Sequence, residues 1–367
     1  MVRIAVIGGR LQGLEALFLA KEAGYRTLLI DRKQNPLARN LADDFLCRDV
    51  SDLCDDTIEA LKKFDLIIPA FEDYEVLAKL DNTAGQCGLP LMADMRAYAV
   101  SSSKKASDVF FRNHSLPIPE RYPGGCFPYI GKIPVSSGSR GICYIADKHM
   151  LDKYINEVDG IVQEFIEGRQ FSAEVIGTPG NYTVYEITEL FVDDGFDCKA
   201  VECPANLPDV KKAEISGIAL KTAEKLGLSG IMDIEFILSP KGFVILEIDA
   251  RFPSQTPVCV YHATGVNYVT ELLNLWKGVK PEHRKPIKHS RLEHYKIENG
   301  VIHALGEHIV AECEQINVYK NCMGVDFCFT DYKEDKRSWA VTLVYGAESA
   351  AALACKHRRA QLGFFIP

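Results

Sequence analysis

The sequence predicts a multidomain protein in which an α/β domain is followed by a larger α+β region and a small C-terminal α+β segment. The N-terminus alternates short apolar strands with helices, and the middle of the chain carries successive strand-like runs typical of an antiparallel sheet. The 367 residues are enough for about two or three hydrophobic cores. We expect domains at 1–98, 99–285 and 286–367, with a smaller subdomain at 99–160.

Composition excludes several classes of protein. The chain is 47% hydrophobic and 25% charged, as in ordinary globular proteins, and its formal charge of −8 argues against a general nucleic-acid binder. No apolar run reaches the ~20 residues of a membrane span, and the N-terminus does not resemble a signal peptide. We therefore expect a cytoplasmic protein with neither nucleic-acid nor membrane partners. The basic run Lys280–Lys296 is expected to be a solvated linker or helix face.

The twelve cysteines include no CxxC pair, so their spacing gives no zinc site. In a reducing compartment they are expected to serve mostly as small core side chains.

The N-terminus reads as a βαβ unit. Strand Arg3–Ile7 leads through Gly8–Gly13 into a helix, and strand Arg26–Ile30 follows and ends at Asp31. A dinucleotide fingerprint would need glycine in place of Arg10, so the match is imperfect. The turn still presents backbone N–H groups that suit an anion or a substrate carboxylate.

Strand Asp65–Ala70 is followed by Glu72, at the end of the strand where ligands of open α/β sheets bind. Glu72 is therefore a candidate for holding an amino group. A plain surface acid is the alternative.

The next region begins with a helix capped by serines, Ser101–His114. Strand Tyr129–Lys132 precedes the small-residue loop Ser136–Gly141, which could fold its N–H groups around phosphate. A flexible surface loop is the alternative interpretation.

Further elements follow from periodicity and turn residues. Strands are expected at Ile161–Ile166, Phe171–Ile176, Tyr182–Phe191, Gly324–Thr330 and Ala340–Tyr345, and helices at Lys211–Leu226, Asn267–Lys277 and Glu348–Leu362.

Two strand-like runs, Ile231–Leu238 and Phe243–Ile248, form a predicted hairpin. The loop Pro240–Gly242 fits a three-residue type I turn closed by a left-handed glycine. This loop length pairs Ser239 with Phe243. One face is then expected to be apolar and to contain Met232, Ile234, Phe236, Val244, Leu246 and Ile248.

The opposite face of the hairpin is acidic. The predicted register sets Glu235 opposite Glu247 and Asp233 opposite Asp249, with Arg251 on the same side. Like charges directly opposed across a sheet are destabilising, and a divalent cation held by oxygen ligands would offset that cost. A solvated outer face is the alternative, because a bulge would shift the register by one residue.

In combination, these pieces resemble the ATP-grasp superfamily of carboxylate–amine ligases. The run Glu247–Arg251 is similar to its metal signature of Glu, any residue, Asn, any residue, Arg, and residues 263–266 are similar to the carbamoyl-phosphate-synthetase branch. GGRLQGLEA at 8–16, DVFFRNHSLPIPE at 108–120 and GIMDIEF with EIDARFPSQTP resemble the 3-methylornithine–lysine ligases of pyrrolysine biosynthesis.

The resemblance implies a Rossmann-like pre-ATP-grasp domain, an ATP-grasp fold and a small C-terminal α+β segment. It also implies ATP and Mg²⁺ as cofactors, and an ADP-forming reaction through an acyl phosphate. The carboxylate of (3R)-3-methyl-D-ornithine would be joined to the ε-amine of L-lysine.

Carried over residue by residue, the resemblance implies roles for this chain. Phosphate contacts are expected from Lys104, Lys132, Ser136, Ser137, Gly138 and Ser139, adenine contacts from Glu164, Phe165 and Ile166, and Mg²⁺ ligation from Glu235, Glu247 and Asp249. Arg251, with Lys104 and Lys132, is expected to stabilise the transferring phosphoryl group. Gln170 stands where the family usually has a ribose-binding acid, and Asp249 where it has Asn.

Both substrates carry extra ammonium groups, so acids should line their pockets. Substrate contacts are expected from Leu11, Gln12, Glu72, Glu174, Asp233, Arg251, Ser254 and Gln255. Asp233, which lies outside the implied metal set, is expected behind the ligands or against a substrate ammonium.

Other functions remain open at this stage. Another ATP-grasp enzyme, such as a D-alanine–D-alanine-like ligase or a carboxylase, would keep the fold. A nicotinamide oxidoreductase would use residues 8–31, but Arg10 in the glycine turn counts against it. A non-catalytic nucleotide sensor would bind ATP without amine-dependent turnover.

Overall fold

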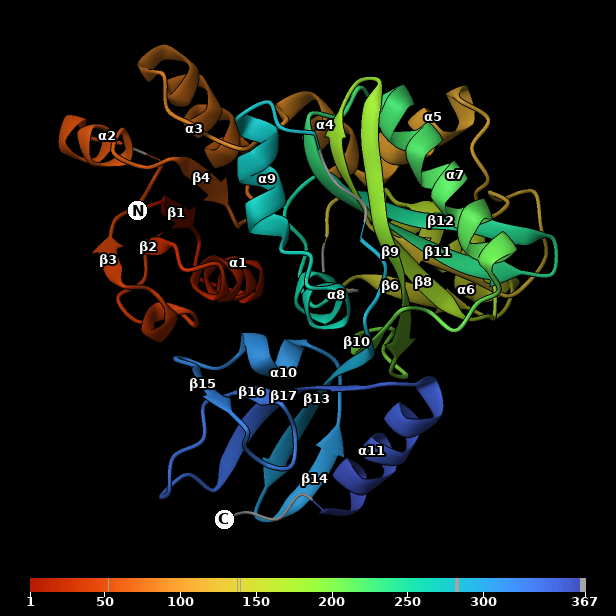
Figure 1. Ribbon diagram of the computed structural model, residues 1–367. Helices are drawn as coiled ribbons and strands as arrows, with labels where there is room; N and C mark the ends of the chain where they lie inside the picture. Colours follow the sequence, from red (N-terminus) through yellow and green to blue (C-terminus); the bar gives the residue numbers. More distant parts are fainter. Residues whose placement is uncertain (52, 137, 139, 281–283, 364–367) are drawn as a thin grey trace.

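The computed structural model describes residues 1–367 except 52, 137, 139, 281–283 and 364–367 (Figure 1). Its described strands form a four-stranded, a three-stranded and a ten-stranded sheet. These sheets confirm the mixed α/β and α+β architecture expected from the sequence.

The N-terminal sheet is parallel, in the order β3-β2-β1-β4. Its elements are β1 (Arg3–Ile7), α1 (Leu11–Glu22), β2 (Arg26–Asp31), β3 (Asp44–Cys47), α2 (Asp55–Leu61), β4 (Leu66–Pro69) and α3 (Tyr74–Cys87). The glycine turn has a steric cause, because a Cβ on Gly13 would lie 1.9 Å from the carbonyl oxygen of Gly8. Asp31 accepts a hydrogen bond from the Gly9 amide at 2.7 Å and so fixes the turn from β2.

The small sheet is antiparallel, in the order β6-β5-β7. Its strands and neighbouring helices are α4 (Met95–Ser101), α5 (Lys104–Asn113), β5 (Tyr129–Lys132), β6 (Ile142–Ile145), α6 (Lys148–Glu157) and β7 (Ile161–Glu164). Ser103 caps α5 by accepting a hydrogen bond from the Ala106 amide. This cap places Lys104 at the first position of the helix.

The ten-stranded sheet follows the path β12-β11-β8-β9-β10-β13-β17-β16-β15, with β14 paired to β13. Its strands are β8 (Gln170–Thr178), β9 (Asn181–Val192), β10 (Cys198–Cys203), β11 (Gly230–Ser239), β12 (Gly242–Asp249), β13 (His289–Glu298), β14 (Val301–Ala304), β15 (Asn317–Lys320), β16 (Phe327–Thr330) and β17 (Ser338–Ala347). The accompanying helices are α7 (Asp209–Leu226), α8 (Thr256–Thr264), α9 (Tyr268–Trp276), α10 (His308–Ala311) and α11 (Ala350–Gly363).

Helix α8, which the sequence did not predict, lies centrally between α1 and the large sheet (Figure 1). With α9 it joins the largest hydrophobic core, which also contains side chains of α1 and of β16. One core therefore connects the N-terminal, central and C-terminal parts of the chain.

The interpretation of Lys280–Lys296 as a solvated linker or helix face is wrong for its second half. Residues from His289 onward form β13, which pairs with β10 and β17 inside the large sheet. Arg291 is buried there because Glu202 and Glu293 accept its hydrogen bonds at 2.5 and 2.8 Å. The large sheet therefore contains strands from both sides of the expected boundary between residues 285 and 286. The domain boundaries stay predictions.

The predicted pairing of the acidic residues across the β11–β12 hairpin is confirmed, but the predicted length of the loop is wrong. Ser239 pairs with Gly242, so the loop has two residues and shifts the register by one. A β-bulge at Leu246 shifts it back, and Glu235 faces Glu247 while Asp233 faces Asp249.

The bulge also corrects the predicted apolar face. Phe243 and Ile245 are buried in the core in place of Val244 and Leu246. Leu246, the extra residue, turns toward the opposite side and lines a cavity.

Among the described residues, no helix is long and apolar enough to cross a membrane.

Candidate active site

A cavity of about 200 Å³ lies between the small sheet and the acidic face of the large sheet. Most of the predicted site residues line it: Lys104, Lys132, Ser136, Gly138, Glu164, Phe165, Ile166, Asp233, Glu235, Glu247, Asp249, Arg251, Ser254 and Gln255. Ser137 and Ser139 lie outside the described residues. Side chains predicted from segments more than 100 residues apart therefore share one wall.

The acids of β11 and β12 are crowded and poorly compensated. Burial, followed by the charge of Glu247, raises the pKa of Glu235 to about 7. Burial also raises the pKa of Asp249 to about 7, where Arg251 opposes the shift and Glu247 adds to it. Burial and the Asp249 charge raise the pKa of Asp233 well above its usual range. The positive charges of Lys104, Lys132 and Arg251 offset this crowding only in part.

A hard divalent cation fits this face. Glu235, Glu247 and Asp249 offer carboxylate oxygens, the donors that Mg²⁺ prefers. Asp233 Oδ1 is buried without a hydrogen-bond partner among the described residues, so this face also contains an acid with an unused acceptor oxygen. The donor set and the crowding of the carboxylates both match a Mg²⁺ site.

The crowding predicts that Mg²⁺ binding at this face depends on pH. Because the pKa values of Glu235 and Asp249 rise to about 7 on folding, these acids hold extra protons in the folded state, and their contribution to the free energy of unfolding falls as pH rises toward 7. Mg²⁺ binds the ionised form, so its affinity should drop roughly tenfold or more between pH 8 and pH 6. We expect the Mg²⁺-induced rise in Tm to be larger at pH 8, and no rise in Glu247→Gln. An equal or larger rise at pH 6 would contradict the assignment.

Two lysines converge on the same acids from the small subdomain. Lys104 Nζ donates to Glu247 Oε1 and, at 3.1 Å, to the carbonyl of Ser136. Lys132 Nζ donates at 3.0 Å to the carbonyl of Leu246, which the β-bulge leaves outside the ladder. Burial lowers the pKa of Lys132, and the Glu247 charge opposes that shift. Both ammonium groups are thus held where phosphate oxygens could replace protein acceptors.

Replacing Lys132 by methionine should raise the KM for ATP by roughly tenfold to 100-fold, because a charge-assisted hydrogen bond contributes about 1.5–3 kcal/mol. The apolar replacement suits a buried position, so Tm should change little. Steady-state kinetics at saturating amino acids measure the effect. Lys153→Met, on α6 and outside the cavity wall, is the matched control. An unchanged KM for ATP would remove Lys132 from the phosphate site.

Arg251 connects the acidic face to the N-terminal domain. It pairs with Asp249 at 2.8 Å and with Glu72 at 2.9 Å, and Glu72 accepts a hydrogen bond from Gln12 at 2.7 Å. The end of β4 and the start of α1 thus connect to Arg251 through Glu72. The neighbouring Arg251 Nε is buried without a partner among the described residues.

Four predicted substrate residues do not line the described cavity wall: Gln12 and Glu72, which connect to it only through Arg251, and Leu11 and Glu174. In the described part of the chain, Leu11 packs against the largest core and Glu174 is fully buried behind the cavity wall. Glu174 accepts hydrogen bonds from Ser172 at 3.0 Å and Tyr268 at 3.2 Å, and pairs with Asp233 across β8 and β11. Glu174 is therefore a neighbour of Asp233 in the sheet, but it does not line the described cavity wall.

Several wall residues had no signal in the sequence. Phe196 and Asp197 come from the β9–β10 connection, Cys198 begins β10, and Glu307 directly precedes α10. Glu307 accepts a hydrogen bond from Ser254 at 3.0 Å. Burial, followed by the Asp197 charge, raises the pKa of Glu307 to about 7. Only the fold brings this second acidic region to the cavity.

The opposite end of the cavity is apolar and aromatic. Phe165 makes edge contacts with Tyr144 and Phe196 at centroid distances of 5.2 and 6.3 Å. Gln170 lines the wall nearby, where an acid was expected for ribose. A flat aromatic ligand such as a nucleotide base suits this end.

Comparison with known proteins gives consistent matches. A family model described as an ATP-grasp domain matches residues 101–255. The 3-methyl-D-ornithine–L-lysine ligase of Methanosarcina barkeri is 36% identical over 315 residues, covering 85% of this chain and 84% of the relative. The ligase of that name from Methanosarcina acetivorans is 36% identical over 331 residues, covering 89% and 88%.

Solved structures match in fold. The N5-carboxyaminoimidazole synthetase of Staphylococcus aureus complexed with ADP has a TM-score of 0.73 at 15% identity, covering 98% of this chain and 96% of that one.

Proposed function

Because this chain belongs to the family of 3-methyl-D-ornithine–L-lysine ligases, within the ATP-grasp enzymes, we propose that it forms the amide between 3-methyl-D-ornithine and L-lysine at the expense of ATP. The bond would link the carboxylate of the (3R)-3-methyl-D-ornithine to the lysine ε-amine, as in pyrrolysine biosynthesis. The observation that carries the proposal is the convergence of the acidic hairpin face with Lys104, Lys132 and Arg251 in one cavity.

The chemistry requires activation of the carboxylate, because oxide is a very poor leaving group. Transfer of the γ-phosphoryl group of ATP to a carboxylate oxygen releases ADP and gives an acyl phosphate. The amine then attacks the carbonyl carbon, phosphate leaves, and the amine loses a proton. One ATP is converted to ADP and phosphate for each amide formed.

In this proposal the two lysines bind the transferred and leaving phosphates, while Glu235, Glu247 and Asp249 would hold Mg²⁺. The ion would neutralise charge on the phosphate oxygens during transfer. Lys104 is already bonded to Glu247, so the positive and negative halves of the site are held together before ATP enters. The nucleotide base would lie at the aromatic end, beside Phe165.

Arg251 would bind the carboxylate that is activated and stabilise the tetrahedral adduct. Its Nη2 contacts both Asp249 and Glu72, so the guanidinium is oriented before the substrate binds. Glu72 and Gln12 would meet lysine from the N-terminal domain, and Asp233, with its unpaired oxygen, would face an ammonium group.

The cytoplasm is our proposed location. All twelve cysteines are free thiols, which supports a reducing compartment.

The experiment that tests this proposal is ADP release over a matrix of amino acids. We expect ADP only when D-ornithine or its 3-methyl derivative is combined with L-lysine, and faster release with the methylated compound. Omission of either amino acid is the control. ADP release with D-alanine alone would instead indicate a D-alanine–D-alanine-like ligase.

A further inference from the structure

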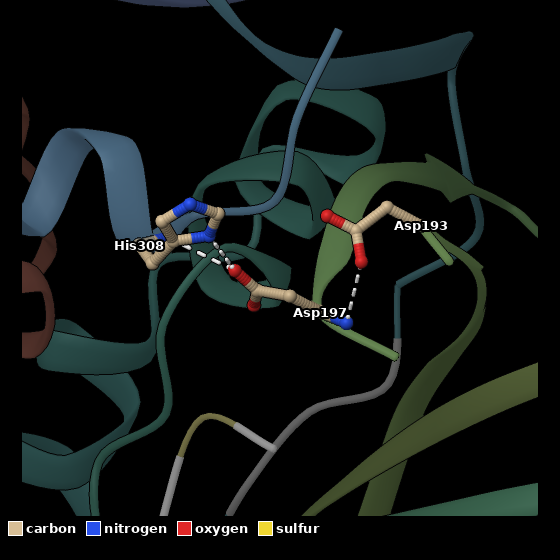
Figure 2. Close-up of side chains that lie close together, drawn as sticks. All are labelled: Asp193, Asp197 and His308. Atoms are coloured by element: carbon tan, nitrogen blue, oxygen red, sulfur yellow. Dashed lines mark hydrogen bonds and ion pairs between the residues drawn. The ribbon is translucent and has the colours of Figure 1, made fainter. Parts of the chain in front are cut away.

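Three side chains from two distant segments meet beside the cavity: Asp193 and Asp197 of the β9–β10 connection and His308 at the start of α10 (Figure 2). Their potential ligand atoms all lie within 4.8 Å of one another, as in a metal site. Their carboxylate oxygens, however, already accept hydrogen bonds from the chain. The geometry therefore explains the cluster as a set of hydrogen bonds that joins the two segments, without an ion.

Within the loop, Asp193 acts as the organising acceptor. Its Oδ1 accepts from the amides of Gly195 and Asp197 at 2.8 and 3.0 Å. Phe196 has a φ of +64°, a conformation that is unfavourable for an aromatic residue. The surrounding hydrogen bonds hold it there, which is typical of segments whose position matters for a binding site.

Between the segments, four hydrogen bonds run from 306–308 to residues 193–198. Asp193 Oδ2 accepts from the Gly306 amide at 3.1 Å, and the Glu307 amide donates to the carbonyl of Cys198 at 3.0 Å. Asp197 Oδ2 accepts from the His308 amide at 3.2 Å and from His308 Nδ1. A Cβ on Gly306 would lie 2.1 Å from Asp197 Oδ2, so this approach requires glycine.

Both joined segments contribute to the cavity wall. Phe196 and Asp197 line it from the loop, and Phe196 contacts Phe165 at the aromatic end. Glu307 lines it from the other segment and accepts from Ser254, three residues after Arg251. The contacts thus run from the aromatic end of the cavity to the region of Arg251.

We propose that Asp193, Asp197 and His308 form a clasp that positions Glu307 on the cavity wall and thereby sets the affinity for the amino acid activated beside Arg251. The three residues are positioning residues, because they act through Glu307 and the loop. The inference rests on the proposed function for the identity of that amino acid. It adds a role for the C-terminal segment, which supplies no other predicted site residue.

The test compares His308→Ala with His308→Asn, since the asparagine amide can replace Nδ1 as a donor to Asp197. We expect His308→Ala to raise the KM for D-ornithine roughly threefold to tenfold, the equivalent of one lost hydrogen bond. The KM for ATP and kcat should stay close to those of the wild type, and His308→Asn should restore most of the affinity. His303→Ala, an exposed histidine of β14, is the matched control.

The rate of backbone amide hydrogen exchange is a second measurement, and it does not depend on catalysis. His308→Ala should speed exchange in 195–198, whereas His303→Ala should not. Faster exchange with an unchanged KM for D-ornithine would overturn the positioning role and leave a purely structural contact. Unchanged exchange would overturn the clasp itself. If the wild-type protein makes no amide while His308→Ala still exchanges faster than the wild type, the proposed function is contradicted and the clasp is retained.

Discussion

Replacing Glu247 by glutamine is expected to reduce amide formation by at least about 100-fold without loss of thermal stability. Glu247 belongs to the acidic face and also forms an ion pair with Lys104. A bound metal ion supplies several kcal/mol of charge stabilisation in phosphoryl transfer. Glu247 also raises the pKa of Glu235 and Asp249, so its neutralisation relieves repulsion in the metal-free protein. We therefore expect an equal or higher Tm in the absence of Mg²⁺.

Glu189→Gln is the matched control for this variant. Glu189 is also a poorly exposed acid bridged to a basic side chain, Arg169 at 2.6 Å, but it lies outside the cavity wall. Glu189→Gln should have a lower Tm and an unchanged rate of amide formation, which is the opposite of the result expected for Glu247→Gln. Near-normal turnover by Glu247→Gln, measured as ADP and amide formed per enzyme, would remove the metal assignment.

Replacing Arg251 by alanine is expected to lower kcat by about 100-fold to 1,000-fold while the affinity for ATP changes little. The size follows from the loss of a preorganised donor to developing negative charge. The affinity for ATP is retained because the phosphate contacts assigned to Lys104 and Lys132 remain. Single-turnover rates and equilibrium nucleotide binding separate the two quantities.

Removal of Arg251 also has a structural cost, since it leaves Asp249 and Glu72 without their shared cation. Arg251→Lys keeps the charge and loses the planar geometry, so its Tm should exceed that of Arg251→Ala while its kcat stays reduced by at least about tenfold. A lysine variant with full activity would mean that charge alone suffices. An alanine variant whose defect lies only in ATP affinity would place Arg251 among the phosphate contacts.

Local signals were enough to predict the acidic face. Asp233, Glu235, Glu247 and Asp249 share a side because strand periodicity and the loop position them there. The predicted pairing of these acids was nevertheless right only because two differences cancel. The loop is one residue shorter than predicted, and the bulge at Leu246 adds one residue back. Loop length and bulges depend on packing against β8 and α5, which the hairpin sequence does not contain.

The bulge has a function that sequence periodicity could not show. It releases the Leu246 carbonyl from the ladder, and that carbonyl accepts the hydrogen bond of Lys132. It also exchanges the buried positions, so that Phe243 and Ile245 pack in the core.

The C-terminal contribution was hidden for a different reason. A run with many basic residues indicates solvent exposure, but β13 buries Arg291 by pairing it with Glu202 and Glu293. Glu307 and Asp197 are ordinary acids in sequence, and they become neighbours only because β10 and β13 pair within one sheet. Such long-range pairings have no local signature.

The most direct test of the central claim is the mass of the product. Purified protein would be incubated with ATP, Mg²⁺, 3-methyl-D-ornithine and isotopically labelled L-lysine. We predict one labelled product whose mass is that of the two amino acids less one water, whose fragments place the amide on the lysine ε-nitrogen, and which forms with one ADP per amide. ADP release without any such amide, or an amide on the lysine α-nitrogen, would contradict the account.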